Sequence, residues 1–227
     1  MKIYKHIILA ALVITLASCK RNDNDSNTSN ENSTAYFKTQ SEAVIRGKND
    51  LISVLRSTSA FQIAVNPELL QKSQPGISIR HLEVNFDQLL KQNELNNLSE
   101  LRSTPKSDIN TLMVDNNLLT VVQTINSPKG WTVTGLADSG LANELSEILG
   151  SQAGLKINDI TLFEVPNLQA FIYKVKTAEG ERYFTNYNGF SLKESISIEQ
   201  LYPVLHSDAL EMERTYGDEL KSKELVK

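Results

Sequence analysis

Cysteine is nearly absent from this chain of 227 residues, because Cys19 is the only one. A protein with a single cysteine forms no internal disulfide, so its folded part must take its stability from a packed core. Histidine is also scarce, with three residues. A tetrahedral zinc site needs three or four His, Cys or carboxylate ligands in recognisable spacing, and the sequence offers no such set. We therefore expect no metal and no cofactor.

A surplus of positive charge is lacking as well. The formal net charge is -4, whereas sequence-independent binding of nucleic acid depends on clustered Lys and Arg. We therefore expect no nucleic-acid partner. Long apolar runs are missing too, since a membrane-spanning helix needs about 20 apolar residues and no run is that long. The chain is 40% hydrophobic and 22% charged, which is typical of a globular protein.

The first 18 residues have the three parts of a secretory signal peptide. Lys2 and Lys5 give a positive start, an apolar run extends from Ile7 to Leu16, and small residues follow. The segment Leu16-Ala17-Ser18-Cys19 resembles the lipobox of bacterial lipoproteins. The resemblance implies cleavage after Ser18, a diacylglyceryl thioether on Cys19 and acylation of the new amine. An ordinary cleaved signal peptide with an incidental cysteine is the alternative.

The lipobox also predicts where the protein is held. One acyl chain holds a protein only marginally, but two or three on one cysteine hold it firmly. The resemblance therefore implies a lipid-anchored protein of the cell envelope, at the outer membrane, with the membrane as a partner through the lipid on Cys19. Its periplasmic or surface orientation stays open. Removal of residues 1–18 takes away Lys2 and Lys5, which moves the formal net charge to -6.

Residues 19–35 follow as a polar segment rich in Asn, Ser, Thr and Asp. Such a segment cannot bury enough apolar surface to offset its ordering entropy. We predict a disordered tether that spans roughly 20–25 Å on average if it behaves as a flexible chain.

Residues 36–206 are predicted to form an α+β globular domain, and residues 207–227 a polar C-terminal helix or tail. Helices are predicted over 39–57, 87–102 and 139–149. Strands are predicted over 60–65, 77–86, 118–125, 131–136, 160–165, 168–176 and 182–187. The segments Asn66-Pro67 and Gln74-Pro75-Gly76 are predicted to be breakers that bound a loop or short helical turn, and residues 103–107 are predicted to open a loop.

The strands form hairpins and a meander, because the connections between them are too short for parallel crossovers. The clearest hairpin has the turn Ser127-Pro128-Lys129-Gly130. Antiparallel sheet packed with several helices defines the α+β class. A helix followed by a hairpin occurs over residues 86–136 and again over 139–187, so one domain and two similar sub-units divided near residue 138 both stay open.

The second of these sub-units carries a resemblance of its own. It consists of the helix over 139–149, the strand LQAFIYKVK, the turn TAEG and the segment ERYFTNYNG. This order over about 139–189 resembles PepSY-type modules. Those are small secreted α+β units associated with protease propeptides and envelope proteins.

Few residues suggest catalytic chemistry. His81 shares a strand face with isoleucines, which favours a packed histidine over a catalytic one. His206 stands beside Ser207 and Asp208, but three adjacent residues cannot normally align as base, nucleophile and orienting group. Capping of a following helix by Ser207 or Asp208 is the favoured interpretation. The glycine-containing segment 135–140 precedes a helix, where amides can bind anions, but a capped strand-to-helix turn is favoured there.

Carboxylates and aromatic residues give the remaining candidates. Glu164, Glu179 and Glu181 are considered as paired carboxylates for glycoside hydrolysis, but the last two flank a tight turn and should be solvated. Aromatic side chains cluster on the predicted sheet, and core packing explains most of them. For ligand binding we select Tyr183, Tyr187 and Trp131.

The sequence therefore assigns no catalytic residue. We expect a lipid-anchored binding or interaction module of the cell envelope that holds a protein, peptide or glycan. A structural or assembly component of an envelope complex is one alternative. A hydrolase whose site is assembled from dispersed polar residues is another.

Overall fold

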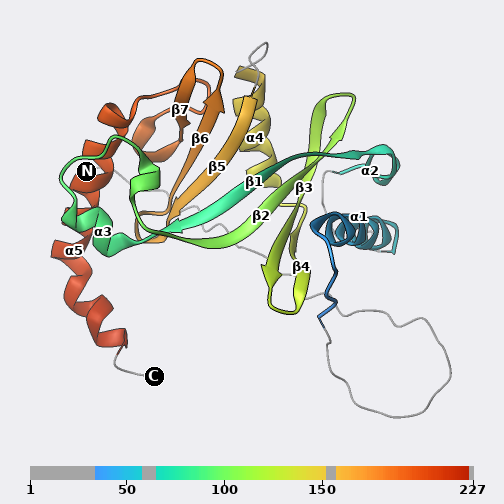
Figure 1. The fold of residues 1–227 in the computed structure, drawn as a ribbon, viewed down its shortest axis with the longest axis horizontal. Coiled ribbons are helices and arrows are strands. Elements are labelled where there is room, and N and C mark those ends of the chain that lie inside the picture. The colour runs from blue at the N-terminus through green and yellow to red at the C-terminus, as the bar shows by residue number, and fades with distance from the viewer. Residues whose placement is uncertain (1–33, 58–64, 152–156, 225–227) are drawn as a thin grey trace, which may run out of the picture.

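The structure, a computed structural model, describes residues 34–57, 65–151 and 157–224. The predicted signal peptide, the lipobox and most of the tether lie outside the described residues, as does nearly all of the strand predicted over 60–65. A seven-stranded sheet in the order β4-β3-β2-β1-β5-β6-β7 runs through the described domain (Figure 1). Within the described residues, no helix is both long and apolar enough to cross a membrane.

The chain interleaves single helices with runs of strands, most clearly β2-β3-β4 and β5-β6-β7. The α-helices are α1 (Gln40–Ser57), α2 (Pro67–Lys72), α3 (Phe86–Lys91), α4 (Ser139–Ser151) and α5 (Ile198–Glu224). The strands are β1 (Gln74–Val84), β2 (Ser103–Val114), β3 (Asn117–Ser127), β4 (Gly130–Leu136), β5 (Ile157–Val165), β6 (Ala170–Thr177) and β7 (Gly180–Phe184). Short 3₁₀ turns are η1 (Leu98–Glu100), η2 (Pro166–Leu168) and η3 (Tyr187–Gly189). The α+β class expected from the sequence is confirmed.

Strand β1 joins the two halves of the chain. It pairs antiparallel with β2 on one side and parallel with β5 on the other. The other pairs between the named strands are antiparallel. The halves on either side of residue 138 therefore share one continuous sheet.

Helices cover both faces of this sheet. Neighbouring residues of one strand point to opposite faces, and Val121 belongs to the core under α4 whereas Val122 belongs to the core under α1. The strand register places Val122 on the same face as Phe163, which packs under α5. Helix α4 thus covers one face, while α1 and α5 cover the two ends of the other face (Figure 1).

Each helical contact buries a separate apolar cluster. The cluster between α4 and the sheet consists of Ile79, Ile109, Val121, Ala142, Leu145, Ile148, Ile160, Leu162, Tyr173, Val175, Phe184 and Leu192. The cluster that joins α3 and α5 to the sheet consists of Val84, Leu89, Leu95, Leu98, Leu101, Phe163, Val165, Ala170, Ile172, Tyr183, Ile198, Leu201, Tyr202, Leu205 and Ala209. The third cluster joins α1 and α2 to the sheet through Val44, Leu51, Leu70, Leu112 and Val122. Burial of these side chains is the main stabilising contribution to the fold.

Local sequence signals explain several elements. Thr39 Oγ1 accepts a hydrogen bond from the N–H of Glu42, and the Glu42 carboxylate accepts one from the N–H of Thr39, which forms a capping box at the start of α1. The predicted hairpin is confirmed, with Ser127 paired to Gly130. Gly130 has φ +118°, a conformation that favours glycine. The meander β5-β6-β7 is confirmed as well.

Four predictions near turns were wrong. The helix predicted over 87–102 is limited to α3, and η1 is the only other helical turn in that range. The predicted breaker 74–76 and the predicted loop 103–107 are instead the first residues of β1 and β2, whereas α2 is the short helical turn expected between Asn66-Pro67 and residue 74. Phe86 begins α3 and does not end a strand, because Asn85 caps that helix by accepting from the N–H of Gln88. Pairing between β1 and β2, with irregular register near Pro75, outweighed the local turn signals.

The C-terminal region also differs from the prediction. Helix α5 begins at Ile198 and continues through Pro203 and residue 206 without a break. Ser207 and Asp208 therefore lie inside a helix and cap none, which corrects the capping interpretation. Buried Leu205 and Ala209 on the same helix explain the continuity, because their packing against the sheet continues past the expected boundary.

Candidate functional site

Three central strands bring four polar residues together on the α4 face. His81 of β1 is paired in register with Ser107 of β2 and with Leu162 of β5. Glu164 lies two residues beyond Leu162, on the same face of its strand. Lys106 stands at the register irregularity between β1 and β2. Residues from widely separated parts of the chain thus form one cluster, which we call the His81 cluster.

The His81 cluster is closely bonded. His81 Nε2 lies 2.7 Å from Glu164 Oε2, and His81 Nδ1 lies 3.2 Å from Ser107 Oγ. Lys106 Nζ donates to both oxygens of Glu164, at 2.8 and 2.7 Å. The relative exposure of the Glu164 side chain is 13%, while that of Lys106 is 43%. Glu164 is therefore a mostly buried carboxylate held between an imidazole and an ammonium group.

Burial determines the charge of the imidazole. It lowers the pKa of His81 from its usual value of 6.5, although the charge and hydrogen bond of Glu164 act in the opposite direction. A neutral ring has one N–H. With that N–H on Nε2, His81 donates to Glu164 and accepts at Nδ1 from the Ser107 hydroxyl.

This order of groups, hydroxyl to imidazole to carboxylate, is the order found in serine hydrolases. Two features favour a structural role here. Lys106 already neutralises Glu164, and His81 is only 8% exposed, which leaves little room for a substrate. The described residues contain no group of three or more His, Cys, Asp or Glu that could hold a metal ion. The cluster therefore acts first as an ionic connection between β1, β2 and β5.

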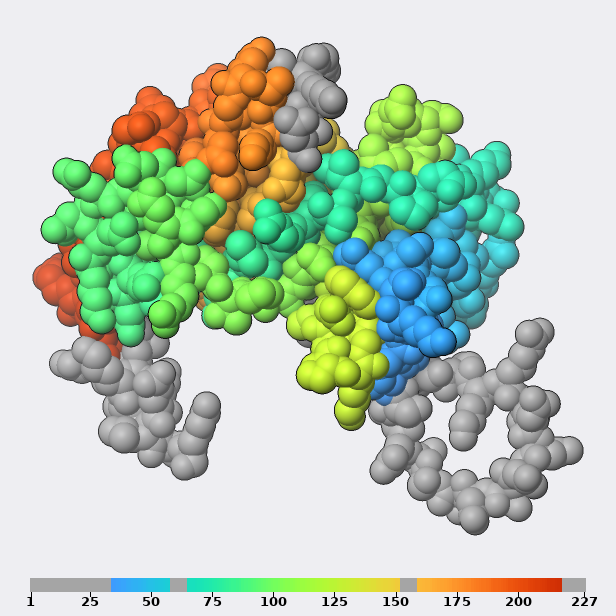
Figure 2. Space-filling model, in the orientation of Figure 1, coloured from blue at the N-terminus to red at the C-terminus, as the bar shows by residue number. Residues whose placement is uncertain are grey.

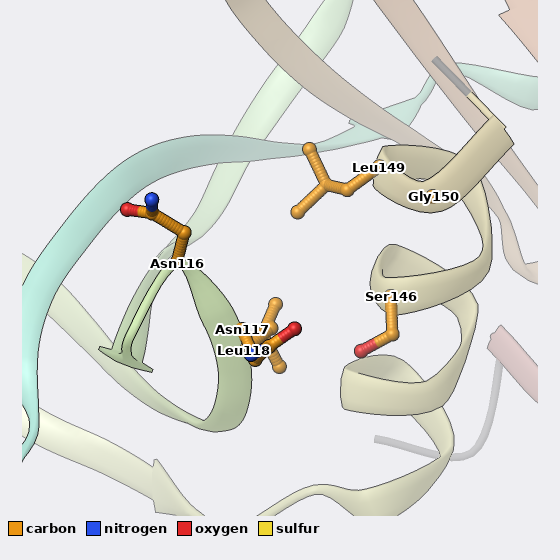
Figure 3. Close-up of a pocket in the computed structure, with 6 residues that line it drawn as sticks. All are labelled: Asn116, Asn117, Leu118, Ser146, Leu149 and Gly150. Atoms are coloured by element: carbon orange, nitrogen blue, oxygen red, sulfur yellow. The ribbon is translucent and has the colours of Figure 1, made fainter. Parts of the chain in front are cut away.

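A pocket of about 240 Å³ lies elsewhere on the domain, between the β2–β3 turn and the C-terminal half of α4 (Figure 3). It is lined by Asn116, Asn117, Leu118, Ser146, Leu149 and Gly150. In Figure 3, Ser146 and Leu149 of α4 face the residues of the turn across the cavity.

The β2–β3 turn holds the pocket amides in place. Asp115 and Asn116 have φ of 49° and 64°, as in the tight turns that join two antiparallel strands. Asn117 Nδ2 donates to the carbonyl of Asp115 at 3.2 Å. On the opposite wall, Ser146 Oγ donates to the carbonyl of Ala142 at 2.8 Å and keeps its lone pairs for another donor.

Helix α4, the other wall of the pocket, is fixed by Glu144. This carboxylate accepts from the hydroxyl of Tyr173 at 2.6 Å and from Nδ2 of Asn186 at 3.0 Å. Burial, followed by the neighbouring Glu144, raises the pKa of Tyr173, so the tyrosine stays a neutral donor. The pocket thus lies between a stiff turn and a helix held to the sheet.

The three aromatic residues selected from the sequence lie apart from the pocket. Tyr183 is 3% exposed, its hydroxyl accepts from the N–H of Leu98, and burial raises its pKa to about 12. Its ring belongs to the core and offers no surface to a ligand, which corrects the expectation of an exposed Tyr183. Tyr187 packs against the same core, and its hydroxyl donates to Asp208 at 2.7 Å. Burial and Asp208 raise its pKa.

Trp131 is partly exposed on the edge strand β4. Its backbone N–H donates to Phe37 and its carbonyl accepts from the N–H of the same residue. The structure therefore places Trp131 at the point where the described chain begins, away from Tyr183 in β7 at the other edge of the sheet.

The remaining candidates have ordinary partners. His206 stacks on Tyr202, with ring centroids 5.7 Å apart. Glu179 pairs with Arg182, and Glu181 pairs with Lys174, so these two carboxylates do not join Glu164. Asp138 Oδ1 accepts from the N–H of Leu141, and this cap confirms the strand-to-helix turn before α4.

Sequence reasoning missed Ser107 and the asparagines of the pocket. Ser107 was placed in a loop, so its pairing with His81 could not be expected. Asp115-Asn116 between two apolar segments is a hairpin signal that would have placed the turn. No local signal predicts that α4 packs beside that turn.

Comparison of the chain with family models, curated proteins and solved structures finds no match in any of the three.

Proposed function

We propose that this chain is a lipid-anchored binding module of the cell envelope. Its lipid is carried by Cys19, at the outer membrane, and residues 20–35 form the tether. The domain binds a glycan or peptide in the pocket between the β2–β3 turn and α4. The proposal assigns no catalytic step to the chain and no cofactor.

The anchor is supported by the segment Leu16-Ala17-Ser18-Cys19 behind a basic start and an apolar run. Metabolic labelling with palmitate tests it. The full chain expressed in a bacterial host should take up the label, and Cys19→Ser should lose it. Label that persists in the variant would show that the lipid is elsewhere and would overturn the anchor.

The observation that carries the binding function is the chemistry of the pocket. Amide groups of Asn116 and Asn117 and the hydroxyl of Ser146 lie beside two leucines, without a charged group in the lining. Neutral hydrogen-bonding groups next to apolar surface fit a sugar ring or a peptide segment better than an ion. Its volume of about 240 Å³ suits one such unit and not a large cofactor.

Nuclear magnetic resonance of the full chain in detergent micelles tests this binding. The side-chain amide signals of Asn116 and Asn117 should shift saturably with N-acetylated oligosaccharides or with short neutral peptides. Asn116→Gly removes one amide and keeps the positive φ, which glycine adopts freely. Loss of one hydrogen bond of about 1 kcal/mol should weaken binding about fivefold.

Asn188→Gly is the matched control, because Asn188 also has a positive φ, of 51°, and does not line the pocket. This variant should bind like the original chain. If neither ligand class shifts the two amides at millimolar concentration, or both variants weaken binding equally, the pocket is not the binding site.

A hydrolase is the second candidate, and the Ser107–His81–Glu164 order is the observation that favours it. A fluorophosphonate probe reacts with an activated serine. Our first proposal predicts that Ser107 is not labelled, since its partner His81 is largely buried. Labelling that disappears in Ser107→Ala would replace the binding module by a hydrolase.

A further inference from the structure

The described chain enters the domain at the free edge of β4. Phe37 and Trp131 form an antiparallel bridge, with N···O distances of 2.7 and 2.8 Å. Gly130 makes the close approach possible, because a Cβ there would lie 2.5 Å from the carbonyl oxygen of Phe37. Phe37, which follows the predicted tether, is therefore held beside the β3–β4 turn.

Cationic and aromatic side chains surround this point. Tyr36 is 42% exposed, and Nζ of Lys129 lies 5.7 Å from its ring centroid. Lys38 and Lys129 are exposed, and within the described ranges neither forms an ion pair with an acidic side chain. We call Tyr36, Lys38, Lys129 and Trp131 the tether-side patch.

One acidic residue lies near this patch in the sequence. The Glu42 carboxylate accepts from the N–H groups of Lys38 and Thr39 at the start of α1. Its negative charge faces the positive end of a helix, which offsets part of it. Within the described residues, Glu42 bonds the backbone of this segment and forms no ion pair with the ammonium group of Lys38 or Lys129.

We propose that the tether-side patch rests on the anionic lipid headgroups of the membrane that holds Cys19. This rests on the lipid anchor of the proposed function. A lysine near an anionic bilayer is attracted to it, and each one raises the equilibrium constant for membrane contact about fivefold. Trp and Tyr rings occupy the interface between lipid and water. A tether of about 16 residues keeps the patch close to the bilayer, so that a weak contact is populated.

The patch and α3 lie on different sides of the domain. The β3–β4 turn points to the bottom of the view beside α1, whereas α3 lies at the left (Figures 1 and 2).

The single tryptophan permits a direct test. The full lipidated chain is inserted into vesicles of phosphatidylethanolamine and phosphatidylglycerol that contain a brominated lipid, a quencher of tryptophan fluorescence. Trp131 should be quenched in these vesicles, less in phosphatidylcholine vesicles, and less at high salt, because salt screens the attraction. The double variant Lys38→Glu, Lys129→Glu should lower the equilibrium constant for contact of the patch with the bilayer by at least about 25-fold. Most of the quenching should then disappear.

Lys91→Glu is the matched control, because Lys91 is an exposed residue of α3, on a different side of the domain from the patch. It makes the same change of charge and should leave the quenching unaltered. Equal quenching in neutral and anionic vesicles, or in the double variant and the original chain, would overturn the patch proposal.

Palmitate labelling of the same samples separates the two proposals. If the label is present and Trp131 is not quenched, the anchor stands and the patch contact is wrong. If the label is absent, the anchor fails and the patch proposal fails with it.

Discussion

His81 of β1 and Glu164 of β5 are joined by a 2.7 Å contact between Nε2 and Oε2. This contact spans the parallel pair through which the two halves of the chain share a sheet. Lys106 of β2 bonds the same carboxylate. One anion thus connects three neighbouring strands, and two of these come from the first half of the chain.

Removal of this carboxylate should destabilise the domain. Glu164→Ala leaves the buried imidazole of His81 without its acceptor and leaves Lys106 with only its longer pair to Glu83, and loss of a partner by a buried group costs about 1–3 kcal/mol. Urea unfolding should show this loss in the free energy of unfolding. Glu179→Ala is the control, since its pair with Arg182 is largely exposed, and it should change stability by less than about 0.5 kcal/mol. Equal losses in both variants would contradict a special role for Glu164.

His81 should also make stability depend on pH. Burial lowers its pKa in the folded chain, and the unfolded value is about 6.5. The unfolded chain therefore binds a proton at a higher pH than the folded chain does, and protonation favours unfolding. This contribution to stability is complete above pH 6.5 and is lost as the pH falls from there toward the folded pKa.

Urea unfolding at a series of pH values between about 7.5 and 5.5 tests this dependence. The free energy of unfolding should fall on acidification, and the fall should be smaller in His81→Gln, which has no titrating ring. A steeper fall in the variant would show that His81 has a raised pKa instead.

Replacement by alanine should have opposite effects on the stability of the domain at two helical glycines. A Cβ at Gly47 of α1 would lie 2.7 Å from Cγ1 of Val122 and 3.1 Å from Cδ2 of Leu136. Gly47→Ala should therefore destabilise the domain by about 1–3 kcal/mol, because overpacking outweighs the gain in helix propensity. Thermal unfolding gives the measurement.

Gly150 of α4 is the matched position, since a Cβ there would meet no atom within 4 Å. Gly150→Ala should leave stability unchanged or raise it by up to about 1 kcal/mol. A stabilising Gly47→Ala would mean that α1 does not pack on β3 and β4 as closely as described.

Two buried threonines offer a similar comparison. Thr161 Oγ1 is buried and has no hydrogen-bond partner among the described residues. Thr161→Val replaces this hydroxyl by a methyl group of similar size and should be neutral or stabilising. Thr185 Oγ1 donates to the carbonyl of Phe171 at 2.6 Å and accepts from the N–H of Tyr187. Thr185→Val should therefore cost about 1–2 kcal/mol in urea unfolding, and a reversed order of the two variants would refute this bonding.

Much of the local structure could be predicted because its causes are local. The turn from Ser127 to Gly130 specifies a hairpin through residues that are adjacent in sequence. The period of apolar residues in α1 and α4 shows which side of each helix is buried. The class of the fold followed from the order of these elements. The candidate lipid anchor at Cys19 is also a property of adjacent residues.

The tertiary structure decided which distant segments meet. Pairing of β1 with β2 made residues 103–107 part of a strand and brought Ser107 to His81, and pairing of β1 with β5 brought Glu164 there, across separations of 26 and 83 residues. Packing of α4 beside the β2–β3 turn formed the pocket, and α5 buried the ring of Tyr183. Such contacts depend on how whole elements share apolar surface, and a local pattern specifies only that a face is apolar and not which partner covers it.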